Sequence, residues 1–405
     1  MSATRRHLAA LGALLLAACP GSGHAVTVVS TESVLNRGFG VNLHLDNCCQ
    51  GNYGDLPTIV KQLNYIGVRH VRDWADSDAQ MTIWHQLRAA TGLRFHASIP
   101  ETSPAHQKAS LDRIAAVLKS DPGLIEVIEG PNEEDNAYPM SVGATLAQAA
   151  ALQIQVAAVG KTYGVPVAQL TVGAGWYPPL YEGHYKSFGT PPADLGNAHI
   201  YMNANSPPLI SLIRIGNLAA YSVPGKPVDV TEFGTYQKLG QSDAVTSTYM
   251  HEAPFDAFAL GYVGLSVYAL HDDMSGVVGF YTRDGYKRDF ADYWHFTTQL
   301  LADPAGRLLP PKTLNLSFSG KGSGIAPLGI KNLAMYKSDG SLWIAAYDEE
   351  RSGAPDSIET IRLDRSYAVV TVIDARNGVT VAQYHNTASI ALPLPCNHVY
   401  FVVAK

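Results

Sequence analysis

Short apolar runs and amphipathic stretches alternate along the chain from Gly38 to Asp303. Each apolar run has the length of a buried strand, and each stretch after it carries apolar residues at helical spacing. The predicted strands are 38–45, 68–74, 93–99, 124–130, 169–176, 197–203, 227–234 and 263–270. The predicted helices are 55–67, 81–91, 106–120, 145–160, 209–221, 244–260 and 290–301.

Eight strand–helix units within roughly 265 residues predict a (β/α)8 barrel, whose usual length is about 250 residues. We place this barrel at residues 38–306. An open, doubly wound parallel sheet is the competing architecture. It is disfavoured because no glycine-rich nucleotide-binding turn follows the first strand.

The pattern changes after Pro310-Pro311. From there the chain shows only alternating runs with turn signals, among them the hairpin dipeptides Asp339-Gly340 and Asn377-Gly378. Residues 307–405 therefore predict an all-β sandwich domain of about seven or eight strands. Residues 26–37 are expected to be extended, and their first part has no partner in the barrel, so we expect it to pair with the sandwich.

The first 25 residues have the features of a signal peptide, namely a basic start followed by an apolar run at 8–18 that is too short to span a bilayer. Two processing routes stay open. The sequence "LAAC" resembles a lipoprotein box that would place a lipid anchor on Cys19, whereas residues 23–25 form an ordinary cleavage site. We therefore expect an exported protein, secreted or periplasmic, or held at the outer membrane as a lipoprotein. No later stretch is long and apolar enough for a transmembrane span.

Composition narrows the choice of partners. The chain has 46% hydrophobic residues and a net charge of −6, which gives no reason to expect nucleic acid as a partner. Export favours disulfides, so Cys396 is expected to bridge to Cys48 or Cys49, with a vicinal Cys48–Cys49 bridge as the less common alternative. No spacing of cysteine and histidine is typical of zinc, and we expect neither a metal nor another cofactor.

Two glutamates stand where a barrel carries its chemistry. The active site of a (β/α)8 barrel lies at the carboxyl ends of the strands. The fourth predicted strand leads into Asn132-Glu133, and Glu232 lies near the end of the seventh. Paired carboxylates facing each other across a barrel are what glycosidic cleavage needs. A separation near 5 Å gives retention of configuration through a covalent intermediate, and a longer one leaves room for water and gives inversion.

Other polar and aromatic residues accompany this pair. Arg72 lies on the second predicted strand, and His199 and Tyr201 lie two positions apart on the sixth, hence on one face. Tyr268 and His271 follow at the end of the eighth. The aromatic rings at these positions either stack on a sugar or pack against the barrel. They are Trp74, Trp176 and Tyr268.

This set of residues resembles the retaining glycoside hydrolases of clan A, also called the 4/7 superfamily, across residues 38–303. The resemblance implies that Glu133 is the acid/base and that Glu232 is the nucleophile. It also implies that Asn132 holds the sugar 2-hydroxyl and that Arg72 steadies the nucleophile. His199 and Tyr201 match the pair on the sixth strand that lies between the two carboxylates.

Because the chain also has an all-β domain, its layout resembles most the clan members that are similar to family 39. One departure concerns Tyr268, because many members have tryptophan at the end of the eighth strand, and this affects the substrate more than the reaction. The sequence thus predicts a retaining hydrolase of β-linked polysaccharides or oligosaccharides. A transglycosylase on the same site is the alternative enzyme, and a carbohydrate-binding surface protein on a disused barrel is the alternative outside enzymes.

Overall fold

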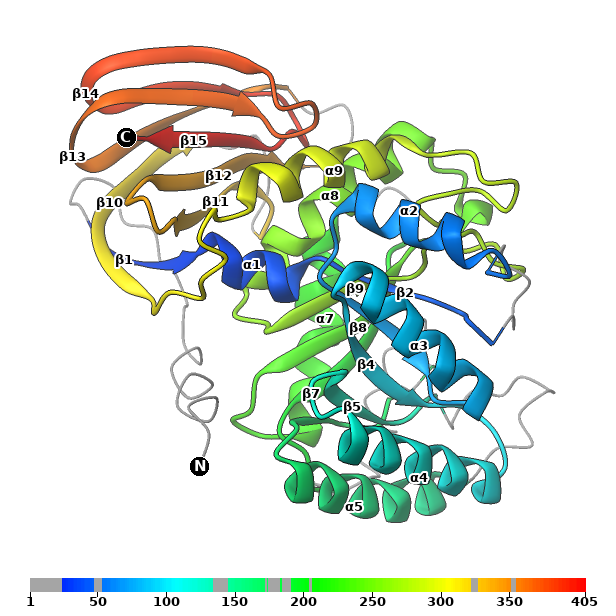
Figure 1. Cartoon of the computed structure of the whole chain (residues 1–405). Coiled ribbons are helices and arrows are strands. Elements are labelled where there is room, and N and C mark those ends of the chain that lie inside the picture. Colours follow the sequence, from blue (N-terminus) through cyan, green and yellow to red (C-terminus); the bar gives the residue numbers. More distant parts are fainter. Residues whose placement is uncertain are drawn as a thin grey trace.

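The computed structural model describes residues 24–46, 53–133, 145–171, 173, 183, 191–203, 206–321, 327–350 and 355–405. Two parts are visible in Figure 1, a barrel of strands surrounded by helices and an all-β domain beside it. Among the described residues, no helix is both long enough and apolar enough to cross a membrane.

Eight parallel strands form the barrel and confirm the predicted fold class. They are β2 (Gly40–Asn42), β3 (His70–Trp74), β4 (Arg94–Ile99), β5 (Ile125–Pro131), β6 (Val167–Ala168), β7 (Gly196–Tyr201), β8 (Val228–Gly234) and β9 (Gly264–Val267). Their order is β6-β5-β4-β3-β2-β9-β8-β7. A parallel bridge between Ala168 and Leu195 brings the two end strands together, so the barrel is nearly closed.

Helices follow the strands and cover the outside of the barrel (Figure 1). They are α2 (Leu56–Ile66), α3 (Asp78–Thr91), α4 (Pro104–Ser120), α5 (Leu146–Tyr163), α7 (Pro208–Ser222), α8 (Asp243–Ala259) and α9 (Asp289–Leu301). Helices α2 and α3 end at Gly67 and Gly92, whose φ values of 73° and 76° are left-handed and favour glycine. These stops return the chain to the next strand, so the strands share one direction and one carboxyl end.

Two predicted boundaries are wrong. The fifth strand was expected at 169–176, but β6 consists of Val167 and Ala168, which pair with Ile128 and Glu129 of β5, and residues 169–171 are not strand. Residues 172 and 174–176 lie outside the described part of the chain. Residues 31–37 were expected to be extended, but they belong to helix α1 (Thr31–Gly38), which is capped by the Ser30 hydroxyl accepting from the Ser33 amide over 3.1 Å. In both places hydrogen bonds set the boundary of the element, and the apolar pattern of the sequence does not reveal these bonds.

The second part is all-β, as predicted. Its strands are β1 (His24–Ser30), β10 (Lys312–Lys321), β11 (Gly329–Tyr336), β12 (Leu342–Glu349), β13 (Ser357–Asp374), β14 (Thr380–Leu394) and β15 (Tyr400–Ala404). The order is β10-β1-β11-β12-β15-β13-β14, and β10 also pairs with β13, so a single sheet turns back on itself. Strand β1 lies antiparallel to β10 and parallel to β11, which places the start of the described chain inside this domain. Its core includes Val28, Leu316, Ile344, Ile361 and Val372.

Helix α8 of the barrel contacts strands β12 and β15 of the all-β domain. The Tyr347 hydroxyl donates to Asp256 Oδ1 over 2.6 Å, and the rings of Phe255 and Phe401 lie 5.9 Å apart. Cys48 and Cys49 lie outside the described residues, so the disulfide stays a prediction. Cys396 lies next to Asp348 near the end of β12.

Candidate active site

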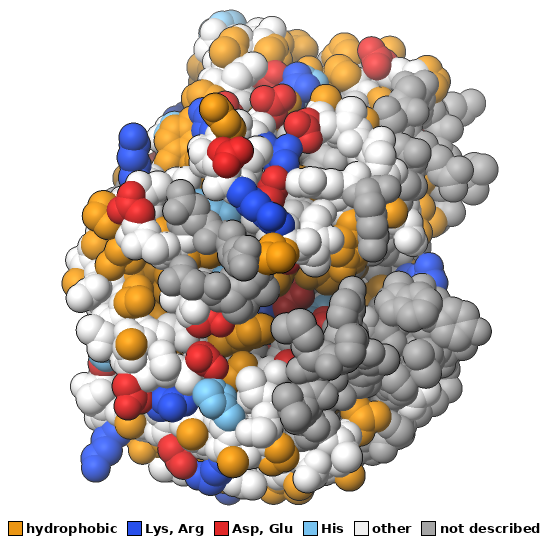
Figure 2. Space-filling view, turned by 90° about the vertical axis from the view of Figure 1, so that its right-hand side faces the viewer, with side chains coloured by type: hydrophobic (Ala, Val, Ile, Leu, Met, Phe, Trp, Pro, Cys, Tyr) orange, Lys and Arg blue, Asp and Glu red, His pale blue; other side chains and the backbone are white. Residues whose placement is uncertain are grey.

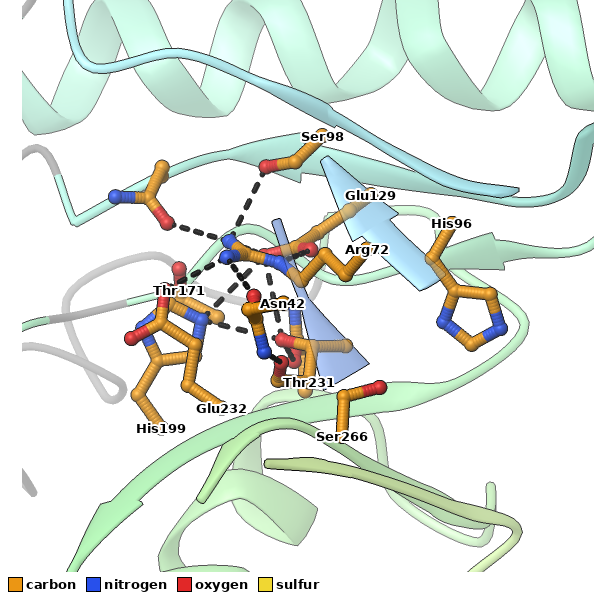
Figure 3. Close-up of polar contacts among 12 residues, drawn as sticks. Asn42, Arg72, His96, Ser98, Glu129, Thr171, His199, Thr231, Glu232 and Ser266 are labelled. Atoms are coloured by element: carbon orange, nitrogen blue, oxygen red, sulfur yellow. Dashed lines mark hydrogen bonds and ion pairs between the residues drawn. The ribbon is translucent and has the colours of Figure 1, made fainter. Parts of the chain in front are cut away.

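Arg72 is the centre of a polar network inside the barrel (Figure 3). Its side chain comes from β3 and is 2% exposed. Its Nε and Nη2 atoms hold both oxygens of Glu129, and Nη1 donates to Glu232 Oε1 over 2.7 Å and to Asn42 Oδ1 over 2.8 Å. Nη2 also donates to Asn132 Oδ1 over 2.7 Å. Such charge-assisted hydrogen bonds fix the guanidinium and the groups around it.

Glu232 lies on β8 and is held from two sides. Arg72 binds Oε1, and the Tyr201 hydroxyl donates to Oε2 over 2.6 Å. Burial raises the pKa of the Glu232 carboxyl group, against the lowering effects of His199, Arg72 and the Tyr201 hydrogen bond. The carboxylate is therefore fixed in orientation, as a group that attacks one atom of a substrate must be.

Glu133 follows the end of β5 and has an unusual backbone. Its φ is 40°, a left-handed value that is uncommon for a residue other than glycine, and its amide donates to Thr171 Oγ1 over 3.3 Å. Its Oε1 lies 2.6 Å from His199 Nδ1, and its side chain is 15% exposed. Strained backbone of this kind is concentrated at functional sites, where the surrounding structure maintains it.

His199 lies between the carboxylates. Its Nδ1 is 3.5 Å from Glu232 Oε2, and its Nε2 is 3.1 Å from Thr231 Oγ1 and 3.5 Å from Glu129 Oε1. Burial acts to lower the pKa of His199, but the surrounding carboxylates raise it to about 10. The imidazole is therefore a cation at neutral pH and donates from both nitrogens.

Glu129 is a third carboxylate, and sequence reasoning gave it no catalytic part. Together with Glu232 it is a second candidate for a catalytic pair, because both are buried and both bind Arg72. Glu129 has no exposed side chain surface, and Arg72 occupies both of its oxygens. Burial opposes its ionisation, but Arg72 and His199 lower its pKa. These properties fit a fixed counter-ion of Arg72 better than a proton donor to a substrate.

The network contains another residue that sequence reasoning missed. Asn42, at the end of β2, accepts from Arg72 and donates through Nδ2 to the Thr231 carbonyl over 2.9 Å. Its position at a strand end is the only sequence signal that could have indicated it. Asn132 was predicted, and because Arg72 takes its Oδ1, its amide N–H groups are the ones that can donate to a ligand.

Aromatic rings pack beside the carboxylates, around a histidine that sequence reasoning also missed. His44 lies 5.7 Å from Trp74 and 5.1 Å from Tyr268, measured between ring centroids, in edge-to-face contacts. Burial lowers the pKa of His44 to about 4, so this imidazole is neutral. Tyr268 also meets Tyr201 edge to face at 6.1 Å. Figure 2 shows acidic and histidine side chains on the floor of a hollow in the face that it views.

Of the predicted site residues, one has no described contact with this group, and another lies outside the described residues. His271 is 1% exposed, and its Nε2 lies 2.8 Å from Gln62 Oε1 of helix α2. Its ring also lies 4.8 Å from that of Tyr53 and 6.1 Å from that of Tyr281, so the contacts described for it are not with the carboxylates. Trp176 lies outside the described residues.

The same groups have a geometry that metal ions use. One ligand atom each from Glu133, His199 and Glu232 lie within 4.8 Å of one another. A cation at this point would have to displace the proton of His199, whose pKa is raised to about 10, and would face the charge of Arg72. The arrangement therefore favours proton transfer over metal binding.

Comparison with known proteins shows that solved structures share the fold of this chain, but it assigns the chain to no family. No family model matches the sequence, and no curated protein matches it. Solved structures do match over nearly the whole chain, at low identity. A glucosidase from Croceicoccus marinus has 12% identity and a TM-score of 0.61, covering 95% of this chain and 100% of the other. A glycoside hydrolase family 30 subfamily 8 xylanase from Clostridium acetobutylicum has 14% identity and a TM-score of 0.58, covering 94% and 99%.

A third similar structure is the α-L-arabinofuranosidase from Thermotoga maritima in complex with arabinose. It has 11% identity and a TM-score of 0.59, and the match covers 94% of this chain and 100% of the other. The barrel with its all-β domain is thus an architecture that these glycoside hydrolases also have.

Proposed function

We propose that this protein is a retaining glycoside hydrolase in which Glu133 is the acid/base and Glu232 the nucleophile. One observation carries the proposal. Carboxylate oxygens of Glu133 and Glu232 approach within 4.8 Å, and their surroundings differ. This distance suits double displacement, for which the carboxyl groups are about 5–5.5 Å apart, and is shorter than the separation that an inverting enzyme needs.

The charges around the pair support the two roles. Arg72 and His199 contribute two positive charges, and Glu129, Glu133 and Glu232 are three carboxyl groups. The five groups together are neutral when one carboxyl group carries a proton. Glu133 is the most exposed of the three, so a proton held there can pass to a substrate. Glu232 is bound by Arg72 and by the Tyr201 hydroxyl, and both contacts support its ionised form.

The reaction then has two steps. Glu232 attacks the anomeric carbon while Glu133 gives its proton to the leaving oxygen, so the glycosidic bond breaks as a glycosyl ester forms. Esterification removes the negative charge of Glu232, and Glu133, now ionised, takes a proton from the water that attacks the anomeric carbon. The bond between that carbon and Glu232 breaks, which restores the Glu232 carboxylate. The sugar leaves with its original configuration. In this proposal Asn132 donates from its amide N–H groups to a sugar hydroxyl beside the reacting carbon, while its Oδ1 accepts from Arg72.

We further propose a β-linked polysaccharide or oligosaccharide as the substrate and export as the location, with the signal peptide and the alternative lipid anchor at Cys19 as its basis. Structures with the same fold include a glucosidase and a xylanase, which supports a carbohydrate substrate without naming the sugar. A transglycosylase would use the same two residues and differ only in the acceptor. A carbohydrate-binding protein is disfavoured because the carboxylates keep all their supporting contacts.

A panel of activated aryl glycosides tests this proposal. Aryl β-glucosides, β-xylosides and β-galactosides, together with α-L-arabinofuranosides, are incubated with the purified protein, and the first product is followed by proton NMR. Hydrolysis of at least one with retained configuration is expected. Product of inverted configuration would exclude double displacement, and binding without any turnover would favour the carbohydrate-binding alternative.

A further inference from the structure

A second cavity lies between the loop that follows β8 and the loop that precedes α9. Its volume is about 250 Å³. This is slightly below the roughly 300–1,000 Å³ of pockets for drug-sized ligands, and suits one small ring. Six of the residues that line it are Tyr236, Gln237, Gln241, Asp243, Thr246 and Arg288.

Its position connects it to the catalytic carboxylates. Tyr236 lies two residues beyond the end of β8, and its ring stacks on that of Tyr201 with centroids 5.1 Å apart and an interplanar angle of 28°. Tyr201 in turn donates to Glu232. A single pair of stacked rings therefore separates the cavity from the nucleophile, on the side of the barrel where substrates enter.

Two hydrogen-bond donors of the lining are unused. Gln241 Oε1 accepts from the Thr235 hydroxyl over 3.2 Å, whereas its Nε2 is buried without a hydrogen-bond partner among the described residues. Arg288 donates from Nη1 to Asp243 and from Nη2 to Asp272, and its buried Nε likewise has no partner in the described chain. Buried donors without partners are costly, so a ligand that offers acceptor oxygens is favoured.

The charges indicate which ligand fits. The positive charge of Arg288 is already met by two carboxylates, at 2.8 Å from Asp243 and 2.7 Å from Asp272. The net charge of this trio is negative, which disfavours a uronate or a sulfated sugar. An aromatic ring, two amides and a hydroxyl suit a neutral ligand with an apolar ring face and many hydroxyl groups.

We propose that this cavity is a second sugar subsite, which binds a neutral monosaccharide unit of the same carbohydrate chain that reaches Glu133 and Glu232. The inference rests on the proposed function, because it assumes that the ligand at the catalytic centre is a saccharide. It adds that the substrate is a neutral oligomer long enough to occupy both places.

Binding tests the subsite directly. In the Glu133→Gln background, isothermal titration calorimetry is run with cellohexaose, xylohexaose, arabinohexaose and the hexamer of galacturonate. Gln241→Glu keeps the shape of the side chain and its bond to Thr235 but loses the Nε2 donor and adds a negative charge. It should weaken the best neutral ligand by about tenfold or more, as expected for the loss of one good hydrogen bond. Gln299→Ala, a change at an exposed glutamine on α9, should leave affinity unchanged.

Three results would overturn the subsite. They are equal affinity of Gln241→Glu and its parent for the neutral hexamers, tightest binding by the galacturonate hexamer, and no binding of any hexamer. With Glu133 intact, Gln241→Glu should reduce kcat/KM for the best hexamer about tenfold more than for an aryl monosaccharide, and an equal reduction for both would also count against the subsite. If the wild type cleaves nothing while calorimetry still shows the loss in Gln241→Glu, the proposed function fails and the subsite stands.

Discussion

The Nδ1 atom of His199 lies 2.6 Å from Oε1 of Glu133. The same atom lies 3.5 Å from Oε2 of Glu232, so one imidazolium from β7 lies between carboxylates from the ends of β5 and β8. The two carboxylates repel each other in this buried site, and the positive charge of His199 offsets that repulsion. The protonation of His199 is therefore tied to the stability of the active-site geometry.

Stability should depend on pH through His199. Its pKa is about 10 in the folded protein and 6.5 in the unfolded chain, so its contribution is complete below pH 6.5 and is lost as pH rises towards 10. The free energy of unfolding of wild type minus that of His199→Asn should fall over this range, by at most about 5 kcal/mol. Denaturant unfolding from pH 5 to pH 10 measures it. The exposed His85→Asn on α3 is the control, and a difference that grows with pH would contradict the assignment.

Replacing the nucleophile should abolish turnover and allow chemical rescue. Glu232→Ala removes the group that forms the glycosyl ester, and loss of a covalent nucleophile costs on the order of 10⁴- to 10⁶-fold in kcat. Azide can occupy the space left by the carboxylate and attack the anomeric carbon from the same face. With an activated β-glycoside we expect an α-glycosyl azide, identified by NMR. A β-glycosyl azide would instead indicate that Glu232 is not the nucleophile.

Two isosteric variants distinguish the proposed pair, Glu133 and Glu232, from a pair in which Glu129 takes the place of Glu133. Glu133→Gln removes the proton donor and should lower kcat/KM by about 10²- to 10⁴-fold for substrates with poor leaving groups, and far less for dinitrophenyl glycosides, which need no proton. Glu129→Gln leaves Arg72 partly uncompensated in the barrel, so it should lower stability by about 3–5 kcal/mol.

For both variants, kcat/KM is measured with a series of aryl glycosides that differ in their leaving groups. Stability is measured by thermal unfolding. If kcat/KM depends on the leaving group in Glu129→Gln but not in Glu133→Gln, Glu129 is the acid/base. Loss of stability alone in Glu129→Gln would leave it as the counter-ion of Arg72.

The contact between the barrel and the all-β domain should also respond to pH. Burial raises the pKa of Asp256 to about 7, so its ionisation lowers stability as pH rises from about 4 through 7. Asp256→Asn keeps the acceptor for the Tyr347 hydroxyl and removes this charge. It should be more stable than wild type at pH 8, by at most about 4 kcal/mol, with no gain at pH 4.

Thermal unfolding at the two pH values measures this effect. Asp112→Asn on α4, where the side chain is 65% exposed, provides the control with an equal change of charge. A gain of the same size at both pH values would show that the charge of Asp256 is not its cause.

The alternation of strands and helices could be predicted from the sequence, and with it the strand ends at which Glu133 and Glu232 lie. This was possible because apolar periodicity is a local property that follows from which faces are buried. Parallel strands joined by helices have their carboxyl ends at the same side of the barrel, whichever strands pair with one another. The pair of carboxylates, Arg72 and the two residues of β7 could therefore be anticipated without coordinates.

The contacts of each of these groups, in contrast, depend on how the whole chain folds. Glu129 and Glu133 are four positions apart and alike in type, but one is held by Arg72 inside the barrel and the other faces His199 at its mouth. The contact of His271 with Gln62 and the short strand β6 could not be predicted for the same reason. Side-chain partners and ladder hydrogen bonds depend on the register between strands far apart in sequence, which no local pattern encodes.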